Sequence, residues 1–459
     1  MHSLKRILAL TALVWLALPA LAASPVHEFM LDNGMKVVIK EDHRAPVAVS
    51  QVWYKVGSSY EEAGSTGLSH VLEHMMFKGT EELGPGEFSR IVAELGGSEN
   101  AFTSRDYTAY FETLSVQHLE RAFELEADRM RNLRLDPAEF AKEIEVVKEE
   151  RRLRTDDKPS GLTYEQLMAV AWRASPYQNP VIGWMNDLDN MQLADLQQWY
   201  ERWYAPNNAT LVVVGDVDPQ QVLALAKKHF EPIAQSDIGQ LKPMREPKQR
   251  GLTRVTVKAP AKQPYMLMGY KTPVVGQADE EWEPYALYVL ASVLDGGNSA
   301  RLSSELVRKQ KLAASAGAQY DAYARLSSLF LFDGTPNDGH TTEQVELALR
   351  AQIKRLQDEL ISAEELKRVV TQAVADKVYQ ADSMFYQAME IGMLETIGLD
   401  WRLLDREIER IKAVTPEQVR AVARKYLVDE NLTVATLVPQ QIEPGAAAVS
   451  APTGGRHGS

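Results

Sequence analysis

The chain of 459 residues contains no cysteine, which removes a whole group of chemistries. Disulfide bonds, thiol catalysis, cysteine-ligated zinc or iron–sulfur sites and cysteine-linked lipid anchors are all excluded. A surplus of basic residues is lacking too, because 50 basic and 63 acidic side chains give a formal charge of −13. Such a charge argues against a nucleic-acid binder, which normally carries a basic face. The chemistry of this protein must therefore use histidine, carboxylates, hydroxyls or lysine.

Long apolar runs are scarce as well. Residues 1–22 have a positive start, a short apolar stretch from Ile7 to Leu18, and a small-x-small site at Ala20 to Ala22. This pattern is typical of a cleaved secretory signal peptide, and the stretch is too short to span a bilayer comfortably as a membrane anchor. No later segment has 18 apolar residues in a row. We therefore expect a mature chain in the bacterial periplasm with no membrane insertion.

A segment near the middle of the chain recurs near its end. Leu193–Asp216 predicts an amphipathic helix, an Asn-containing turn and a β-branched strand, and Thr415–Pro439 repeats that order. The matching residues fall at an offset of about 222 positions, namely Tyr204 with Tyr426 and Asn208 with Asn431. This offset predicts a duplicated domain rather than a solenoid repeat. Chance similarity of two helix–strand pairs is the alternative.

Strands and helices alternate without a regular βαβ order, so the sequence predicts an α+β fold with largely antiparallel sheets packed with helices. The predicted organisation is a signal peptide (1–22), an N-terminal domain (23–234), a polar linker (235–251), a related C-terminal domain (252–443) and a disordered tail (444–459). Strands are predicted at Met35–Lys40, Val47–Val56, Tyr107–Leu114, Thr210–Val214, Thr253–Val257, Tyr265–Tyr270 and Ser327–Phe332.

Two histidines stand four residues apart in His70-Val-Leu-Glu73-His74. The segment from Thr66 to Gly79 predicts a helix that Thr66 caps at its start. His70, Glu73 and His74 share one helical face, and the other face is apolar. Burying these three side chains calls for a partner, and a divalent metal supplies one, because two imidazoles one turn apart both reach the ion. Two satisfied core histidines that flank a glutamate are the alternative.

A second predicted helix, opened by Asp136-Pro137, offers a third metal ligand. Glu143 and Glu150 lie on or beside its apolar stripe, while Glu145 and Glu149 point elsewhere. Glutamate is rarely buried unless it is paired or coordinates a metal. The alternative is that these carboxylates pair at the edge of the stripe with Lys142 or Arg151.

These motifs resemble those of a known family. HVLEHMMFKGT, followed 76 residues after His74 by Glu150 in the segment EIEVVKEE, resembles the inverted-motif zinc peptidases of the pitrilysin type. That family includes insulin-degrading enzyme and the mitochondrial processing peptidase. GGSENAFTS (96–104), DYTAY (106–110) and PVIGW (180–184) extend the resemblance, which covers nearly the whole mature chain.

The resemblance implies a zinc endopeptidase that hydrolyses extended or unstructured peptides, with two homologous domains in a clamshell arrangement. It assigns one zinc per chain to His70, His74 and Glu150, with Glu73 as the general base that takes a proton from the zinc-bound water. It places Glu143 behind a ligand imidazole, which it orients. The strand that holds the substrate backbone would carry Asn100, Ala101 and Thr103.

The second half departs from the family pattern. Complete family members supply an arginine and, seven residues on, a tyrosine that help to hold the substrate. Here Val307 and Ala314 stand at those places, and the neighbouring Arg308 has Ser315 as its seventh neighbour. Because some bacterial members are split into two chains, the resemblance predicts that this chain is the zinc-bearing subunit of a heterodimer. A homodimer is the alternative.

Other functions stay open. A non-catalytic peptide-binding or scaffolding subunit would be expected to lose a ligand or the base, and this sequence keeps His70, Glu73, His74 and Glu150 together. A periplasmic zinc carrier would not need Glu73. The acidic net charge would favour basic peptides as substrates, although net charge alone does not locate the potential.

Overall fold

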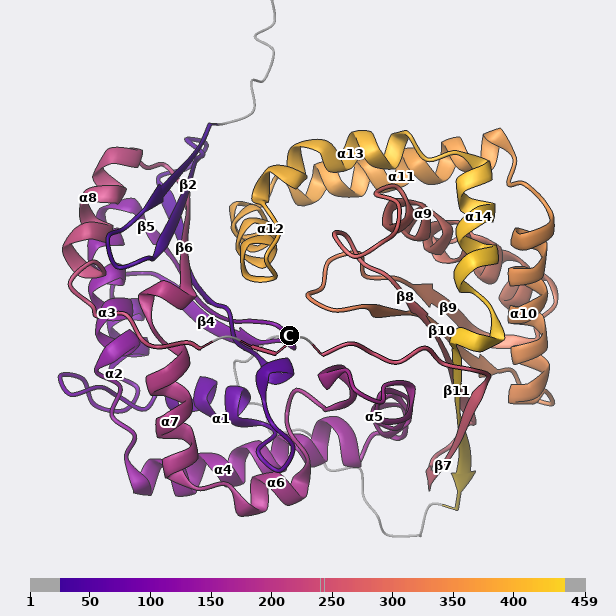
Figure 1. The fold of residues 1–459 in the computed structure, drawn as a ribbon, viewed down its shortest axis with the longest axis horizontal. Helices are drawn as coiled ribbons and strands as arrows, with labels where there is room; N and C mark the ends of the chain where they lie inside the picture. The colour runs from indigo at the N-terminus through magenta and orange to yellow at the C-terminus, as the bar shows by residue number, and fades with distance from the viewer. Residues whose placement is uncertain (1–24, 240, 243, 442–459) are drawn as a thin grey trace, which may run out of the picture.

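The computed structural model describes residues 25–239, 241–242 and 244–441, which form two sheets (Figure 1). The first sheet has six strands in the order β1-β2-β6-β3-β5-β4. Its strands are β1 (Val26–Met30), β2 (Lys36–Glu41), β3 (Val47–Tyr54), β4 (Ser98–Thr103), β5 (Thr108–Ser115) and β6 (Ala209–Gly215). The second sheet has the order β7-β11-β8-β10-β9. Its strands are β7 (Thr253–Pro260), β8 (Tyr265–Thr272), β9 (Ala313–Gln319), β10 (Ser328–Pro336) and β11 (Leu432–Gln440).

Apart from β1, the second sheet repeats the first strand by strand. β2 pairs in parallel with β6 as β7 does with β11, and the remaining neighbours in both sheets are antiparallel. All seven strands predicted from apolar patterning are confirmed, and so is the α+β class. β1, β4 and β9 lack a strong apolar alternation, because they are edge strands with sequences such as SENAFT and AASAGAQ.

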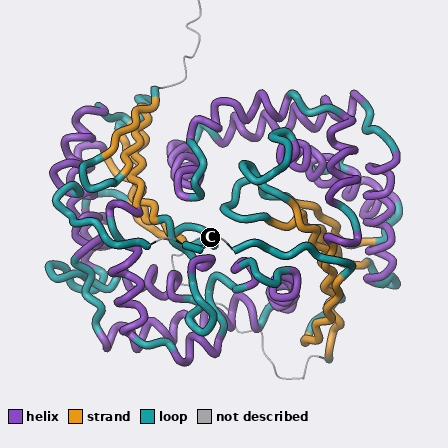
Figure 2. The backbone as a smooth tube through the Cα atoms, viewed as in Figure 1, coloured by secondary structure: helices purple, strands orange, loops and turns teal. Residues whose placement is uncertain are grey.

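Helices surround both sheets, which lie on opposite sides of the molecule in Figure 2. The first half contains α1 (Leu68–Met75), α2 (Glu87–Glu94), α3 (Leu119–Arg131), α4 (Pro137–Arg151), α5 (Pro159–Ala171), α6 (Met185–Asn190), α7 (Leu193–Trp203) and α8 (Pro219–His229). The second half contains α9 (Glu283–Asp295), α10 (Thr342–Asp358), α11 (Ala363–Gln380), α12 (Met384–Thr396), α13 (Leu404–Lys412) and α14 (Pro416–Tyr426).

Each half sends one helix onto the sheet of the other half. α5 packs against β7, β8 and β11, and α12 packs against β3 and β6 (Figure 1). Gly392 lets α12 approach the sheet closely, since a Cβ at this position would overlap the indole of Trp53. This second covered face explains why every residue of β6 is buried. The reciprocal exchange joins the two halves by packing and not by the connecting chain alone.

The repeated helix–strand unit is present as α7–β6 and α14–β11. Asn208 donates a hydrogen bond from Nδ2 to the carbonyl of Trp203 at 2.9 Å, and Asn431 donates one to the carbonyl of Tyr426 at 3.0 Å. Matching the two asparagines therefore sets Trp203 opposite Tyr426. The predicted match of Tyr204 with Tyr426 is wrong by one residue.

Several predictions of domain organisation stay predictions. The signal peptide (1–22) and the tail (444–459) lie outside the described residues. The described part of the 235–251 segment contains no helix or strand. None of the helices in the described ranges combines the length and apolar character needed to cross a membrane.

Candidate metal centre

The helix α1 is buried on almost every side, and an unexpected carboxylate holds its first turn. The backbone N–H groups of Gly67 and Ser69 both donate to Glu61 at 2.7 Å. Thr66 instead donates from Oγ1 to Asp187 at 2.6 Å, so the predicted Thr66 cap is wrong. Gly67, the residue that precedes the helix, has a φ of 91°, a conformation that favours glycine. Burial raises the pKa of Glu61 to about 7.

The helix α4 begins as predicted, because Asp136 accepts hydrogen bonds from the backbone N–H groups of Ala138 at 2.8 Å and Glu139 at 3.2 Å. Glu143 is buried and Glu150 half-buried on the inner side, whereas Glu145 and Glu149 are exposed. The two inner carboxylates do not pair with Lys142 or Arg151. Those two cations bind Glu139 at 2.7 Å and Glu165 at 2.8 Å, respectively.

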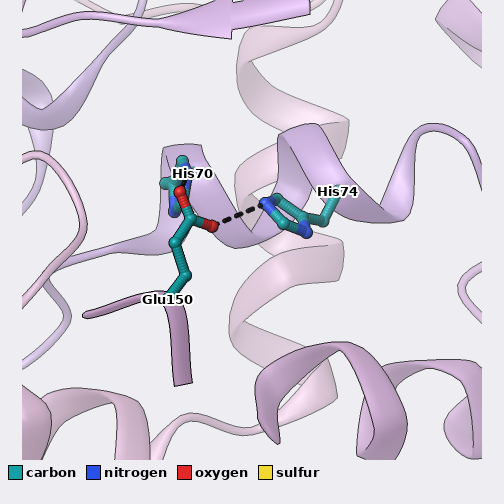
Figure 3. Close-up of side chains that lie close together, drawn as sticks. All are labelled: His70, His74 and Glu150. Atoms are coloured by element: carbon teal, nitrogen blue, oxygen red, sulfur yellow. Dashed lines mark ion pairs between the residues drawn. The ribbon is translucent and has the colours of Figure 1, made fainter. Parts of the chain in front are cut away.

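Three side chains converge where α1 passes the end of α4. Glu150 Oε1 lies 3.8 Å from His70 Nε2, and Glu150 Oε2 lies 3.4 Å from His74 Nε2. Figure 3 shows the Glu150 carboxylate facing two imidazoles that project from successive turns of α1. Within the described residues, this is the one group of three or more histidine, aspartate or glutamate side chains whose potential ligand atoms lie within 4.8 Å of one another.

The chemistry of the donor set fits zinc. Two imidazole nitrogens and one carboxylate oxygen are a known zinc ligand set, and donor atoms around tetrahedral zinc lie about 3.3 Å apart. The observed separations of 3.4 and 3.8 Å are close to that spacing. A fourth position on such an ion would remain open to water or substrate.

The electrostatics of the cluster also favour a cation. Burial lowers the pKa of His74, but the carboxylates of Glu143 and Glu150 outweigh burial and raise that pKa to about 9. Burial raises the pKa of Glu150, but His74, His70 and Arg154 bring it down to about 2. A site that holds a proton on imidazole so firmly is short of positive charge, and a divalent ion supplies that charge.

Glu143 supports the imidazole of His74 from behind. Its Oε2 lies 3.3 Å from His74 Nδ1, and its Oε1 lies 2.7 Å from Lys78 Nζ. Burial raises the pKa of Glu143, but the neighbouring His74 and Lys78 more than offset this and lower it below the usual value. A carboxylate behind an imidazole fixes the ring orientation and raises its basicity as a ligand.

Glu73 lies on the same face of α1, beside the three convergent side chains. Thr103 of β4 donates from Oγ1 to Glu73 Oε2 at 2.5 Å, which fixes the orientation of the carboxylate. Burial raises the pKa of Glu73. An ionised carboxylate in such a place readily accepts a proton, because burial disfavours its charged form.

A pocket of about 400 Å³ opens over these side chains, and every residue that lines it falls between positions 70 and 182. The predicted residues on its wall are His70, Glu73, His74, Ala101, Thr103 and Glu150. Asn100 is on β4 but not on this wall, and its Oδ1 accepts from the backbone N–H of Ala101 at 2.9 Å. Because β4 is an edge strand, an extended peptide can add to it by main-chain hydrogen bonds.

Sequence reasoning missed several residues of the pocket, among them Arg154, Arg105 and Tyr164. Arg154 lies 2.8 Å from Glu150 Oε1 through Nη1, and its spacing four residues after Glu150 was an available signal. Arg105 and Tyr164 also line the pocket. They come from a turn and a distant helix, so no local pattern connects them.

Comparison with known proteins gives the class of this fold and site. Residues 36–184 match the family model described as insulinase (peptidase family M16), and residues 190–373 match the model described as peptidase M16 inactive domain. The chain therefore belongs to the M16 family of insulinase-like peptidases. All the residues that converge around the pocket lie in the first of the two matches.

Relatives named as zinc proteases make the comparison more specific. The chain is 36% identical over 390 residues to zinc protease PqqE of Helicobacter pylori, covering 83% of this chain and 87% of that protein. It is 25% identical over 414 residues to the uncharacterized zinc protease YmxG of Bacillus subtilis, covering 90% and 98%, respectively.

Solved structures share the fold. The crystal structure of a protease from Helicobacter pylori matches with a TM-score of 0.87 at 33% identity, covering 91% of this chain and 100% of that one. The periplasmic protease PqqL from Escherichia coli matches with a TM-score of 0.75 at 19% identity, covering 91% and 48%, respectively. These likenesses agree with the predicted clamshell of two α+β domains.

Proposed function

We propose that the protein is a zinc-dependent endopeptidase of the pitrilysin type that hydrolyses extended or unstructured peptides. The convergence of His70, His74 and Glu150 beside Glu73, in a chain of the M16 family, is the observation that carries this proposal. Zinc bound by those three residues would polarise the scissile carbonyl and lower the pKa of a coordinated water.

The chain's own residues do the remaining work. Glu73 acts as the general base, accepts the proton of the attacking water and later passes it to the leaving amine. Thr103 keeps the Glu73 carboxylate in place, and Glu143 keeps the ring of His74 in its ligating orientation. The edge strand β4, which carries Asn100 and Ala101, holds the substrate backbone in an extended form.

The test compares the wild type with Glu73→Gln by zinc content and by cleavage of an unstructured peptide. We expect both proteins to bind about one zinc per chain and hydrolysis to fall by about 100- to 10,000-fold in the variant. Undiminished hydrolysis by Glu73→Gln would remove the assigned base. Zinc binding without any Glu73-dependent cleavage, with or without a partner subunit, would favour the non-catalytic scaffolding subunit.

We further propose that the chain is the zinc-bearing subunit of a periplasmic heterodimer, exported by the signal peptide at residues 1–22. Every residue that lines the metal pocket comes from the first half. The two positions of the second half that hold an arginine and a tyrosine in complete family members hold Val307 and Ala314 here. Val307 packs against the core of the second half, and Ala314 lies exposed on β9.

The partner expected is a similar-sized chain that carries the R-x6-Y pair and lacks an intact H-x-x-E-H motif. Co-expression with such a chain and light scattering of the purified protein test this. A 1:1 complex with raised peptidase activity supports the heterodimer. A homodimer that is fully active without a partner would contradict it.

A further inference from the structure

Arg105 is a half-buried cation that lines the metal pocket. It stands in the turn directly after β4, where Nη2 donates to the Tyr164 hydroxyl at 2.9 Å. Its guanidinium carbon lies 5.6 Å from the ring centre of Tyr177 and 6.0 Å from that of Tyr164. No carboxylate of the described residues lies within 4.0 Å of the guanidinium, and the buried Nε has no hydrogen-bond partner there. Such an arrangement is costly unless an anion completes it.

The position of Arg105 lies on the path that a bound peptide would take. The metal pocket of about 400 Å³ adjoins a second pocket of about 320 Å³, and Arg105, Tyr164 and Met168 line both. The second pocket is completed by the other half of the chain, through Gln319, Tyr320, Tyr323, Leu329 and Leu331. A peptide that lies along β4 and continues past Thr103 therefore carries a side chain to the guanidinium.

The acidic side chains nearby are either occupied or more distant. Asp106 accepts hydrogen bonds from Ser59 Oγ at 2.7 Å and from the Tyr177 hydroxyl. It also accepts them from Arg325, whose backbone N–H donates at 3.0 Å and whose Nε donates at 3.3 Å. Asp321 lines the second pocket but lies more than 4.0 Å from the guanidinium of Arg105.

Two other charged side chains of the metal pocket, those of Glu165 and Arg154, are already in ion pairs. Glu165 is paired with Arg151 at 2.8 Å, and Arg154 lies 2.8 Å from Glu150. Arg105 is thus the lining cation that has no carboxylate of the described residues as its counter-ion.

We propose that Arg105 selects peptides that place an acidic side chain, Asp or Glu, beside the bond to be cleaved. This inference rests on the proposed peptidase function and narrows its substrate class. A guanidinium binds a carboxylate through two parallel, charge-assisted hydrogen bonds. A neutral side chain of the peptide cannot form this charged pair, and a lysine of the peptide is repelled by the guanidinium. The positive charge at Arg105 thus opposes, at one position of the peptide, the preference for basic peptides that the net charge of −13 suggests.

The experiment measures binding rather than turnover. Zinc-loaded, full-length mature Glu73→Gln protein is titrated with fluorescent, otherwise uncharged peptides in which one Glu, Gln or Lys is moved through each position. At one position of the peptide, we expect the peptide with Glu to bind about tenfold more tightly than the peptide with Gln. The peptide with Lys at that position should bind more weakly than the peptide with Gln. Arg105→Gln in the same background should remove the preference, whereas the exposed Arg308→Gln should keep it. Arg105→Lys, which keeps the charge without the planar fork, should retain part of it.

The outcomes separate this inference from the proposed function. Equal affinities for the three peptides, an absence of binding, or a Glu preference that survives Arg105→Gln would overturn the role of Arg105. Tighter binding of Lys would also overturn it and would assign selection to Asp321. Failure of the peptidase function is read separately, from cleavage that is absent in the wild type or unchanged in Glu73→Gln. Thermal melts of each variant verify that a lost preference does not reflect unfolding.

Discussion

The helices α1 and α9 occupy equivalent places in the two halves, since α1 follows β3 and α9 follows its counterpart β8, but the side chains that they bury differ. α1 buries His70 and Glu73 among its apolar residues. α9 buries an almost wholly apolar surface, including Tyr285, Leu287 and Leu290. The architecture therefore accepts an apolar helix at this place and does not require the histidines or the glutamate. Burying those polar groups costs free energy, which their partners and the proposed metal ion would offset.

Another pair of equivalent helices, α4 and α11, shows the same contrast. α4 presents Glu143 and Glu150 toward α1, whereas α11 buries only Val369 and Ala373. The acidic side chain of α11 that is ion-paired is Glu365, which binds Arg301 at 2.7 Å, away from any histidine. The same arrangement of helices and strands thus occurs twice, and, among the described residues, the side chains proposed to bind a metal occur only in the first copy.

The largest effect expected is on metal-dependent stability. Chelation should lower the melting temperature of the wild type, because a metal that binds only the native state adds about 4 kcal/mol at 1,000 times its dissociation constant. Glu150→Gln should melt at nearly the same temperature with and without chelator. Glu365→Gln, on the equivalent helix α11, should respond to chelator as the wild type does. If chelation still lowered the melting temperature of Glu150→Gln, the proposal that Glu150 of the first half binds the metal would be contradicted.

The next effect concerns the carboxylate that holds the start of α1. Because burial raises the pKa of Glu61 from 4.5 to about 7, its protonated form favours folding, and that contribution is lost as the pH rises through about 7. The shift corresponds to roughly 3 kcal/mol. Urea unfolding at pH 5 and pH 8 should therefore show a smaller loss of stability in Glu61→Gln than in the wild type.

The matched variant for that measurement is Glu283→Gln, at the start of α9. Glu283 has a cation beside it, with Lys425 Nζ at 2.5 Å. The pH dependence of Glu283→Gln should resemble that of the wild type more closely than that of Glu61→Gln. Identical curves for Glu61→Gln and the wild type would show that Glu61 does not titrate in this range.

The exchange of α5 and α12 between the halves can be tested at Gly392. Gly392→Ala should lower the free energy of unfolding by about 1–3 kcal/mol, because the added methyl overlaps the indole of Trp53. The cost should shrink when Trp53→Leu is also present, which a double-mutant cycle measures. Additive costs in the two variants would contradict a direct contact.

The smallest effect is expected at the support for the ligand imidazole. Glu143→Gln should weaken zinc affinity by about 10- to 100-fold without abolishing binding, because the ring of His74 loses its charged partner. A competition titration with a chromogenic chelator measures this. Glu139→Gln, on the same helix but paired with Lys142, should leave the affinity unchanged. Equal affinities in all three proteins would make Glu143 dispensable.

Much of the fold and of the metal cluster was predictable because the signals are local. The spacing of His70, Glu73 and His74 fixes one face of a helix, and the stripe of α4 singles out Glu143 and Glu150 from their neighbours. The proposal that His70, His74 and Glu150 bind zinc, however, rests on resemblance to a family rather than on spacing.

What could not be predicted depends on contacts between distant segments. The pattern of α12 marks residues for burial but does not say that the sheet of the other half covers them. Thr66 has the right chemistry for a cap, yet Glu61 takes the N–H groups because the left-handed Gly67 redirects the chain. Arg105 contacts Tyr164 only in the folded chain, so no local sequence pattern predicts this hydrogen bond.

The central claim is that the first half holds a metal and the second does not, and elemental mass spectrometry of the purified mature chain tests it most directly. The account predicts about one zinc per wild-type chain, about one in Glu365→Gln, and strongly reduced zinc in Glu150→Gln. An absence of zinc from the wild type after metal repletion, or full zinc content in Glu150→Gln, would contradict it.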